Sequence, residues 1–356
     1  MATHIVGLYA SSVMIVSFRR QYPKFLFPGE SDKVESPQAS QYPRASYELD
    51  TINPLTWERV ARDIVASAPD LVVMPAWTFF VAPCLGWIAR KCQKAGIRVT
   101  QIVHNVSDHE ASWWKSRLTG FQLSHADGFV AHNTSMRNDL VRQFPATPIA
   151  IHPLPVNNTL PKAKGLRARK AKLELLFFGI VRNYKGLDLA LKAMNLLKPS
   201  DVRLTIVGEF WEDLDATEAL VTDLGITEQV TIVSRYVSDE EAAEYFASSD
   251  AVLMPYRSAS GSAVIPLAYY YGKPVVASNL PGLTELISEG KTGWIMPENT
   301  PEQLSCVIDK FVTRQACEEM ATAIGLVSAN LQWPAYIEGM LQQAGLSCPA
   351  STDPKM

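Results

Sequence analysis

The chain contains 356 residues, of which 47% are hydrophobic and 19% charged, enough for about two domains with apolar cores of their own. This composition excludes a disordered protein and a small fold stapled by disulfides. The 33 basic and 36 acidic residues give a net charge of −3, so no global positive field favours nucleic acid or an anionic bilayer. We expect no nucleic-acid partner, and any contact with a membrane must be local.

The cysteines and the amino terminus bear on the compartment. The cysteines form no C-x-x-C pair and are odd in number, which favours buried thiols in a reducing compartment over a zinc site. The segment MATHIVGLYASS lacks the basic start, apolar centre and cleavage site of a signal peptide. We therefore predict a cytoplasmic protein. The cysteines are Cys84, Cys92, Cys306, Cys317 and Cys348.

One stretch, residues 71–89, is free of charged residues for 19 positions, nearly enough to cross a bilayer. Pro75, Pro83 and Gly86 interrupt it, and three basic residues follow closely. The pattern favours a buried strand, a turn and a helix over a membrane span.

Short runs rich in Val and Ile alternate with helical patterns, which predicts βαβ units and parallel sheets. In the amino-terminal half, strands are expected at 4–9, 71–74, 98–103, 128–131 and 149–151, with helices at 57–67 and 111–123. In the carboxyl-terminal half, strands are expected at 173–178, 203–207, 230–233, 251–255 and 274–277, each followed by a helix. The sequence thus predicts an α/β protein with two doubly wound parallel sheets.

Residues 152–172 separate the halves. They combine a proline-rich stretch with six basic residues in eleven, which favours a linker with a solvated face over a binding site. We expect an amino-terminal domain over 1–158, a basic linker over 159–172, a second domain over 173–330, and a carboxyl-terminal helix over 331–356 that returns to the first domain. Residues 21–44, with four prolines, are expected to form a long loop.

Ligands bind at the carboxyl ends of parallel strands. The first such loop of the second domain runs from Gly179 to Gly186 and carries Arg182 and Lys185. These two cations could neutralise a diphosphate beside a helix start. The alternative is an ordinary strand-loop-helix connection with two exposed cations.

The fourth loop of the second domain, residues 255–263, is rich in small residues. Ser258 and Gly261 would let a ligand approach the backbone closely. It is either a second anion cradle or an ordinary turn with serine caps.

Five segments, in order and over about 120 residues, resemble retaining glycosyltransferases of family four, which have the GT-B fold of two Rossmann-like domains facing a cleft. The first domain matches more loosely, at residues 103–105 and 129–137. The resemblance implies a nucleotide-diphosphate sugar donor held by the second domain and an acceptor held by the first. The five segments are 179–186, 207–209, 249–256, 272–277 and 282–293.

The resemblance also implies site residues. Lys185 matches a lysine that contacts the donor diphosphate, and Arg182 takes the place of an arginine that relatives carry after Gly179, where this chain has Ile180. No metal or other cofactor is implied, because these cations already compensate the diphosphate. The implied donor-binding residues are Gly179, Arg182, Lys185, Glu209, Tyr236 and Val237 (near the base), Ser258, Gly261, Ser262, Ala263 and Glu285.

One departure concerns the fourth loop. Relatives usually carry two glutamates eight positions apart, near the transferred sugar and on the ribose, where this chain has Ala259 and Leu267. Leucine accepts no hydrogen bond, so the ribose must be held differently. Glu285 matches a different family glutamate. The chain resembles a bacterial polysaccharide-type variant that lacks the glutamate pair.

His104 follows the strand 98–103, where family members place a histidine near the transferred sugar. It is the implied catalytic residue, able to donate a hydrogen bond to the sugar or to orient the acceptor. The alternative is a capped loop histidine. No general base is assigned, because the leaving diphosphate can take the acceptor's proton.

Two further patterns have competing explanations. Asp213 and Asp215 match an acid-x-acid metal motif, but their place at a helix start favours a structural role. Trp113 and Trp114, beside cations, suit packing in the core or an acceptor loop, or else a membrane interface; packing is favoured.

These inferences predict a glycosyltransferase that moves a sugar to a glycan or lipid-linked acceptor in bacterial surface-polysaccharide synthesis. It would act in the cytoplasm or at the inner face of the plasma membrane. The rivals are a nucleotide-sugar epimerase of the same fold and a non-catalytic nucleotide-sugar-binding protein.

Overall fold

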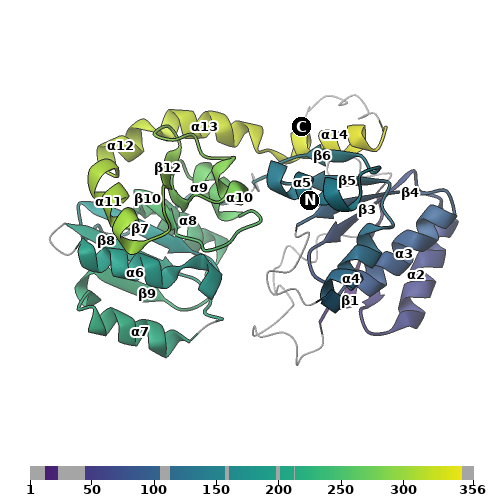
Figure 1. The fold of residues 1–356 in the computed structure, drawn as a ribbon, viewed down its shortest axis with the longest axis horizontal. Coiled ribbons are helices and arrows are strands. Elements are labelled where there is room, and N and C mark those ends of the chain that lie inside the picture. Colours follow the sequence, from purple (N-terminus) through teal and green to yellow (C-terminus); the bar gives the residue numbers. More distant parts are fainter. Residues whose placement is uncertain are drawn as a thin grey trace. The chain divides into compact units, whose positions relative to one another are not determined.

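The computed structural model describes residues 13–22, 45–104, 113–156, 160–197, 201–211 and 213–346. The chain divides into two compact units. The first extends to Pro153 and resumes at Trp333, and the second runs from Leu154 to Gln332. Each unit has a parallel sheet with helices around it (Figure 1).

The first unit contains a four-stranded parallel sheet in the order β3-β4-β5-β6 and a parallel pair, β1 and β2. The strands expected at 71–74, 98–103, 128–131 and 149–151 are confirmed, whereas β1 and β2 were not predicted; the strand expected at 4–9 and most of the proposed loop 21–44 lie outside the described residues. The strands are β1 (Ile15–Arg20), β2 (Ala45–Asp50), β3 (Leu71–Ala76), β4 (Arg98–Val103), β5 (Gly128–Ala131) and β6 (Ile149–Ile151).

The uncharged stretch 71–89 forms a strand, a turn and the start of a helix, as predicted. Pro83 stands in the first turn of that helix, where its missing N–H is tolerated. Within the described parts of the chain, no helix is long and apolar enough to span a membrane. The helices of the first unit are α2 (Pro54–Ser67), α3 (Ala82–Lys94), α4 (Trp113–Leu123), α5 (Thr134–Gln143) and α14 (Trp333–Gln343).

Helix α14 belongs to the first unit although it follows the second unit in sequence (Figure 1). Its Ile337 and Met340 are 1% exposed and pack with Ile102 of β4 and Val130 of β5. Burial of such side chains contributes about 1.5–3 kcal/mol each, so this contact holds α14 on the sheet.

The second unit contains a six-stranded parallel sheet in the order β12-β11-β10-β7-β8-β9. Its expected strands are confirmed to within one residue at their ends, and β12, which begins at a glycine, is additional. The strands are β7 (Leu173–Phe178), β8 (Val202–Val207), β9 (Val230–Val233), β10 (Ala251–Met254), β11 (Val275–Ser278) and β12 (Gly293–Met296).

Helices cover both faces of this sheet. From β7 the chain proceeds outward through β8 to β9, and from β10 it proceeds the other way to β12, so right-handed crossovers place the two sets of helices on opposite faces. The elements are η3 (Asn183–Lys185), α6 (Leu187–Leu196), α7 (Leu214–Asp223), η4 (Thr227–Gln229), α8 (Asp239–Ser248), α9 (Val264–Tyr270), α10 (Pro281–Thr284), α11 (Pro301–Phe311), α12 (Arg314–Glu319) and α13 (Ala321–Asn330).

The strand order has a consequence for ligand binding. Strands β7 and β10 are neighbours, and the order of the chain reverses between them. In open parallel sheets, ligands bind outside the carboxyl ends of the strands at such a switch point. The loops after β7 and β10 are therefore the first place to look for a site in this unit.

The basic segment 162–172 contacts the second unit. Arg169 forms an ion pair with Asp250 at 2.7 Å, and the guanidinium carbon of Arg167 lies 3.8 Å from the centre of the Tyr245 ring. These contacts tie the segment to one end of the sheet.

Three of the described cysteines are buried and one, Cys306, is half-buried. Burial raises the pKa of Cys84 and Cys317 to about 12 and that of Cys92 to about 11. These thiols remain protonated and unreactive at neutral pH.

Candidate functional site

The loop after β7 is shaped around a lysine. Gly179 has a φ of +97°, and a Cβ there would lie 3.1 Å from Nζ of Lys185, so the glycine leaves space for the ammonium group. A Cβ on Gly208, after β8, would lie 2.2 Å from the carbonyl oxygen of Gly179. Since only glycine adopts these conformations without strain, the two strand ends approach closely at this point.

Lys185 is 8% exposed. Burial, followed by the charge of Arg182, lowers its pKa to about 8. Its Nζ lies 5.8 Å from the centre of the Tyr256 ring, and Arg182 lies over the ring of Trp211 at 5.5 Å. The alternative of an exposed cation is therefore wrong for Lys185.

The neighbouring cations are neutralised by a carboxylate, whereas the described residues provide none for Lys185 and Arg182. Asp188 binds both Arg257, at 2.7 Å, and Lys192, at 3.5 Å. Among the described residues, neither Lys185 nor Arg182 has a carboxylate oxygen within 4.0 Å. A buried charge without a partner is costly, and an anion at this corner would offset that cost for Lys185.

Arg257 fastens the loop after β10 to the loop after β7. Its guanidinium donates to both carboxylate oxygens of Asp188 and to the carbonyl of Asn183, and its backbone N–H donates to the carbonyl of Tyr184. A Cβ on Gly186 would lie 2.0 Å from the carbonyl oxygen of Pro255. Arg257 therefore braces the site instead of facing a ligand as a free cation.

The loop after β10 is small and half-open. Ser258 and Gly261 are half-buried and Ala263 is exposed, while Ser262 accepts a hydrogen bond from the N–H of Val264 at 3.2 Å. The hydroxyls of Ser262 and the buried Tyr256 are hydrogen-bonded, and burial raises the pKa of Tyr256. Helix α9 has Ala263 as its N-cap residue and no side-chain cap hydrogen bond, so the serine cap of the ordinary-turn interpretation is replaced by a local turn at Ser262. The loop adjoins Lys185 through Tyr256.

The remaining predicted donor residues are more scattered. Glu209 lies beside the first loop, because its carbonyl accepts from the N–H of Val181 at 2.8 Å. Tyr236 is 75% exposed and follows β9, whereas Val237 is 7% exposed and its side chain packs in the core. Only the backbone of Val237 is left for a ligand. Glu285 is exposed at the end of α10.

The two positions where the family usually has glutamate hold side chains that pack in this unit. Ala259 and Leu267 are half-buried and pack against the core of the second unit. A Cβ on Gly282 would lie 2.6 Å from the carbonyl oxygen of Ala259, so α10 sits close against this loop.

His104 lies in the first unit, directly after β4. Its backbone N–H donates to the carbonyl of Ala76 at 2.8 Å. Its ring atom Nδ1 lies 3.1 Å from Nε2 of His132, the residue after β5. Burial lowers the pKa of His104. The sequence analysis missed His132; the available signal was a histidine directly after each of two expected strands.

The two remaining patterns have clear outcomes. Asp213 caps α7 by accepting from the N–H of Ala216, the structural role that was favoured. In the described residues, no group of three or more His, Cys, Asp or Glu side chains is arranged to hold a metal ion. Core packing is wrong for Trp113, which is 75% exposed, whereas Trp114 packs edge-on against Phe79 at 5.2 Å.

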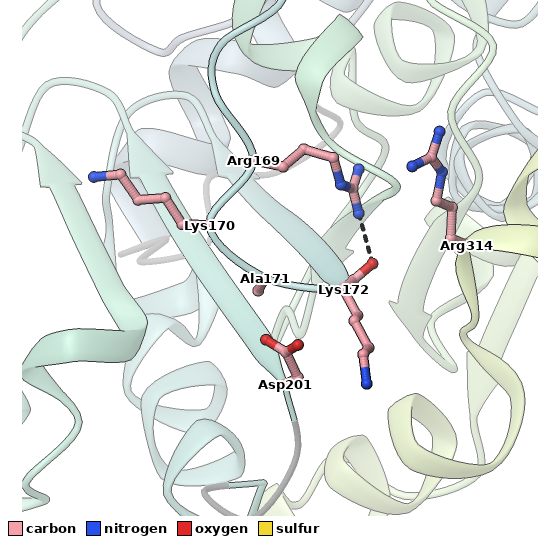
Figure 2. Close-up of a pocket in the computed structure, with 6 residues that line it drawn as sticks. All are labelled: Arg169, Lys170, Ala171, Lys172, Asp201 and Arg314. Carbon is pink, nitrogen blue, oxygen red and sulfur yellow. Dashed lines mark hydrogen bonds between the residues drawn. The ribbon is translucent and has the colours of Figure 1, made fainter.

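A basic hollow of about 560 Å³ lies elsewhere in the second unit. Figure 2 shows its lining residues and the hydrogen bond from Arg169 to the carbonyl of Lys172. It adjoins the amino ends of β7 and β8, the edge opposite Lys185, and is separate from the candidate site. The lining residues are Arg169, Lys170, Ala171, Lys172, Asp201 and Arg314.

Known proteins are similar to this chain, above all in the second unit. Residues 161–325, most of the second unit, match the family described as Glycosyl transferases group 1. The chain is 27% identical over 169 residues to an uncharacterised protein in the cps region of Klebsiella pneumoniae, covering 46% of this chain and 45% of that one. It is 30% identical over 216 residues to D-inositol 3-phosphate glycosyltransferase of Paenarthrobacter aurescens, covering 58% and 52%. It thus spans about half the length of these curated relatives.

A solved structure confirms the fold. Anabaena HepE in complex with UDP-glucose superposes with a TM-score of 0.66 at 16% identity, covering 86% of each chain. At this identity the likeness establishes the fold alone. The expected architecture of two Rossmann-like parallel-sheet domains is confirmed.

Proposed function

We propose that this protein is a glycosyltransferase that moves a sugar from a nucleotide-diphosphate sugar to a glycan or lipid-linked saccharide, with retention of anomeric configuration. The observation that carries the proposal is the pair of cations Lys185 and Arg182 at the switch point between β7 and β10, for which the described part of the chain offers no carboxylate within 4.0 Å. A diphosphate is the ligand that such a corner fits best, because it supplies the missing negative charge.

The chemistry follows from charge. When the bond between the sugar and the diphosphate breaks, negative charge grows on the leaving diphosphate, and Lys185 and Arg182 stabilise it without reorganising. His104 orients a sugar or acceptor hydroxyl, and the leaving diphosphate takes the acceptor's proton. Since Ala259 and Leu267 cannot bind a ribose through carboxylates, we propose that Glu285 contributes that contact.

We further propose that this transfer belongs to surface-polysaccharide synthesis and takes place at the inner face of the plasma membrane. One of them is encoded in a cps region, and the neighbour in fold binds UDP-glucose. The exposed Trp113 and Trp114 stand beside Lys115 on α4, a combination suited to a membrane interface and hence to a lipid-linked acceptor.

The decisive experiment mixes the purified protein with UDP-, GDP- and ADP-sugars and follows nucleotide release with and without lipid-linked saccharide acceptors. Acceptor-dependent release is expected with one class of donor. Binding of a donor without release under any acceptor would instead identify a sensor.

The phosphate assignment has its own test. Lys185→Ala should weaken donor binding by about 2 kcal/mol, or about thirtyfold, the scale of a lost charge-assisted hydrogen bond. The matched control is Lys170→Ala, which removes the same charge from an exposed position at the other edge of the sheet. Equal affinities of both variants, measured by calorimetry, would remove Lys185 from the site.

A further inference from the structure

Three histidines stand in a row at the carboxyl edge of the first unit's sheet. His104 follows β4, His132 follows β5 and His152 follows β6. Nδ1 of His132 lies 3.1 Å from the backbone carbonyl oxygen of His152, and Nε2 of His132 lies 3.1 Å from Nδ1 of His104. Adjacent parallel strands end side by side, which aligns the three residues.

The backbone carbonyl group of His152, at one end of this row, determines which ring nitrogens carry hydrogens. A carbonyl oxygen only accepts, so Nδ1 of His132 must carry a hydrogen and donate it to His152. If His132 is neutral, its Nε2 then holds a lone pair and can only accept. Nδ1 of His104 must therefore be the donor, which leaves Nε2 of His104 without a hydrogen.

The surroundings keep His132 neutral. Its side chain is buried, its ring stacks with Tyr336 of α14 at 6.2 Å, and its hydrogen-bond partners are a carbonyl group and a second imidazole. Burial, reinforced by the neighbouring His104, lowers the pKa of His132 to about 4.

Helix α14 completes the arrangement at His152. A Cβ on Gly339 would lie 2.0 Å from Cε1 of His152, so the helix backbone touches this ring directly, and the ring is hydrogen-bonded to the Gly339 backbone. His152 is thereby held in place, and its carbonyl with it.

We propose that His132 is a positioning residue that holds His104 as its Nδ1–H tautomer, so that Nε2 of His104 accepts a hydrogen bond from a ligand hydroxyl. Among the described residues, no group is hydrogen-bonded to Nε2 of His104. The tautomer follows from the hydrogen-bond geometry and the neutral state of the buried His132, while the sugar or acceptor hydroxyl as its ligand rests on the proposed function. Under this proposal His104 accepts a hydrogen bond from the sugar or acceptor hydroxyl, which differs from donation to the sugar, one of the two roles inferred from the sequence.

The tautomer is measured directly by long-range ¹H–¹⁵N correlation spectra of the whole protein with ¹⁵N-labelled histidine, assigned with His104→Gln and His132→Phe. The expected result is that both residues are Nδ1–H tautomers at pH 7 and that His132 remains neutral at pH 5.5. An Nε2–H tautomer of His104, or a charged His132 at pH 7, would overturn the proposal.

Two variants of His132 separate positioning from packing. In His132→Gln, the side-chain carbonyl reaches the place of Nε2 and accepts from His104, so the tautomer is kept. In His132→Phe, the ring is kept but the acceptor is lost, so the Nδ1–H signature of His104 should disappear. His125→Phe, outside the row, should leave it unchanged. An unchanged tautomer in a folded His132→Phe variant would refute the role.

A kinetic comparison connects the tautomer to function. His132→Phe should lower kcat about tenfold while the donor Kd stays the same, and His132→Gln should restore kcat. Because the spectra need no substrate, a protein that shows the expected tautomers but no transfer activity would refute the proposed function and leave the tautomer assignment intact.

Discussion

Lys185 shows how much one buried charge can imply. In the unliganded protein its pKa is about 8, against 10.5 for an ordinary lysine. As the pH rises, Lys185 loses its proton at a lower pH in the folded state than in the unfolded state. The charged group therefore lowers the free energy of unfolding by its full amount below pH 8, and this penalty disappears as the pH rises from 8 to 10.5. A protein can tolerate this loss of stability at a binding site, because a ligand of opposite charge removes the penalty when it binds.

This pKa predicts the pH dependence of donor binding. Between pH 7 and pH 9 the protonated fraction of Lys185 falls about tenfold, from roughly 0.91 to 0.09, so the affinity for UDP should fall about tenfold. Calorimetry in buffers of different ionisation enthalpy should show proton uptake on binding at pH 9. In Lys185→Gln both effects should be absent, and a similar decline in that variant would assign the titration to another group.

At the scale of elements, two loops form one site because of backbone approach. The turn between η3 and α6 touches the loop after β10 at Gly186, whose φ is +66°. Gly272, at the end of α9, has a φ of +68°, and a Cβ added to it would meet no atom within 4 Å. The two glycines share a conformation and differ only in the space around them.

The difference in space predicts different costs for the same substitution. Gly272→Ala should destabilise by about 1–2 kcal/mol, the cost of the left-handed conformation. Gly186→Ala should cost a further 1–3 kcal/mol, roughly, because its Cβ must displace the carbonyl of Pro255. Urea unfolding measures both, and donor affinity should fall in Gly186→Ala only. Equal costs would show that the loops do not depend on this contact.

At the scale of the whole molecule, the chain enters the second unit at Leu154 and leaves it at Gln332. The first unit is therefore completed by a helix from the far end of the sequence. Its apolar contact with β4 and β5 is independent of the core that surrounds β7 and β8. Each unit should respond separately to mutations in its own core.

Ile337→Ala tests this independence. Removal of a side chain that is 1% exposed should cost about 2–5 kcal/mol. Hydrogen exchange should then show lower protection of β4 and β5, with β7 and β8 unchanged. The control Leu326→Ala, on the exposed face of α13 at 70% exposure, should change neither unit by more than about 0.5 kcal/mol. Loss of protection in both units after Ile337→Ala would contradict the division.

The strands were predictable where both faces are buried. Residues 173–178 and 98–103 stand out as apolar runs because a central parallel strand contacts helices on each side. Strands β1, β2 and β12 were not predicted, because β1 and β2 include polar and half-exposed positions and β12 begins with a glycine. Local pattern is weakest where the sheet is only partly covered.

The amino-acid order alone predicted the two parallel sheets and the loops at their strand ends, because buried parallel strands appear as local apolar runs. It also offered Lys185 and His104 as candidates, through their places after expected strands and through the resemblance to a known family. The folded arrangement was needed to show that β10 lies beside β7, that Lys185 is buried with no carboxylate of the described residues to neutralise it, and that His104, His132 and His152 stand in a row. Burial and adjacency are sums of contacts between segments far apart in the chain, so no single stretch of sequence contains them.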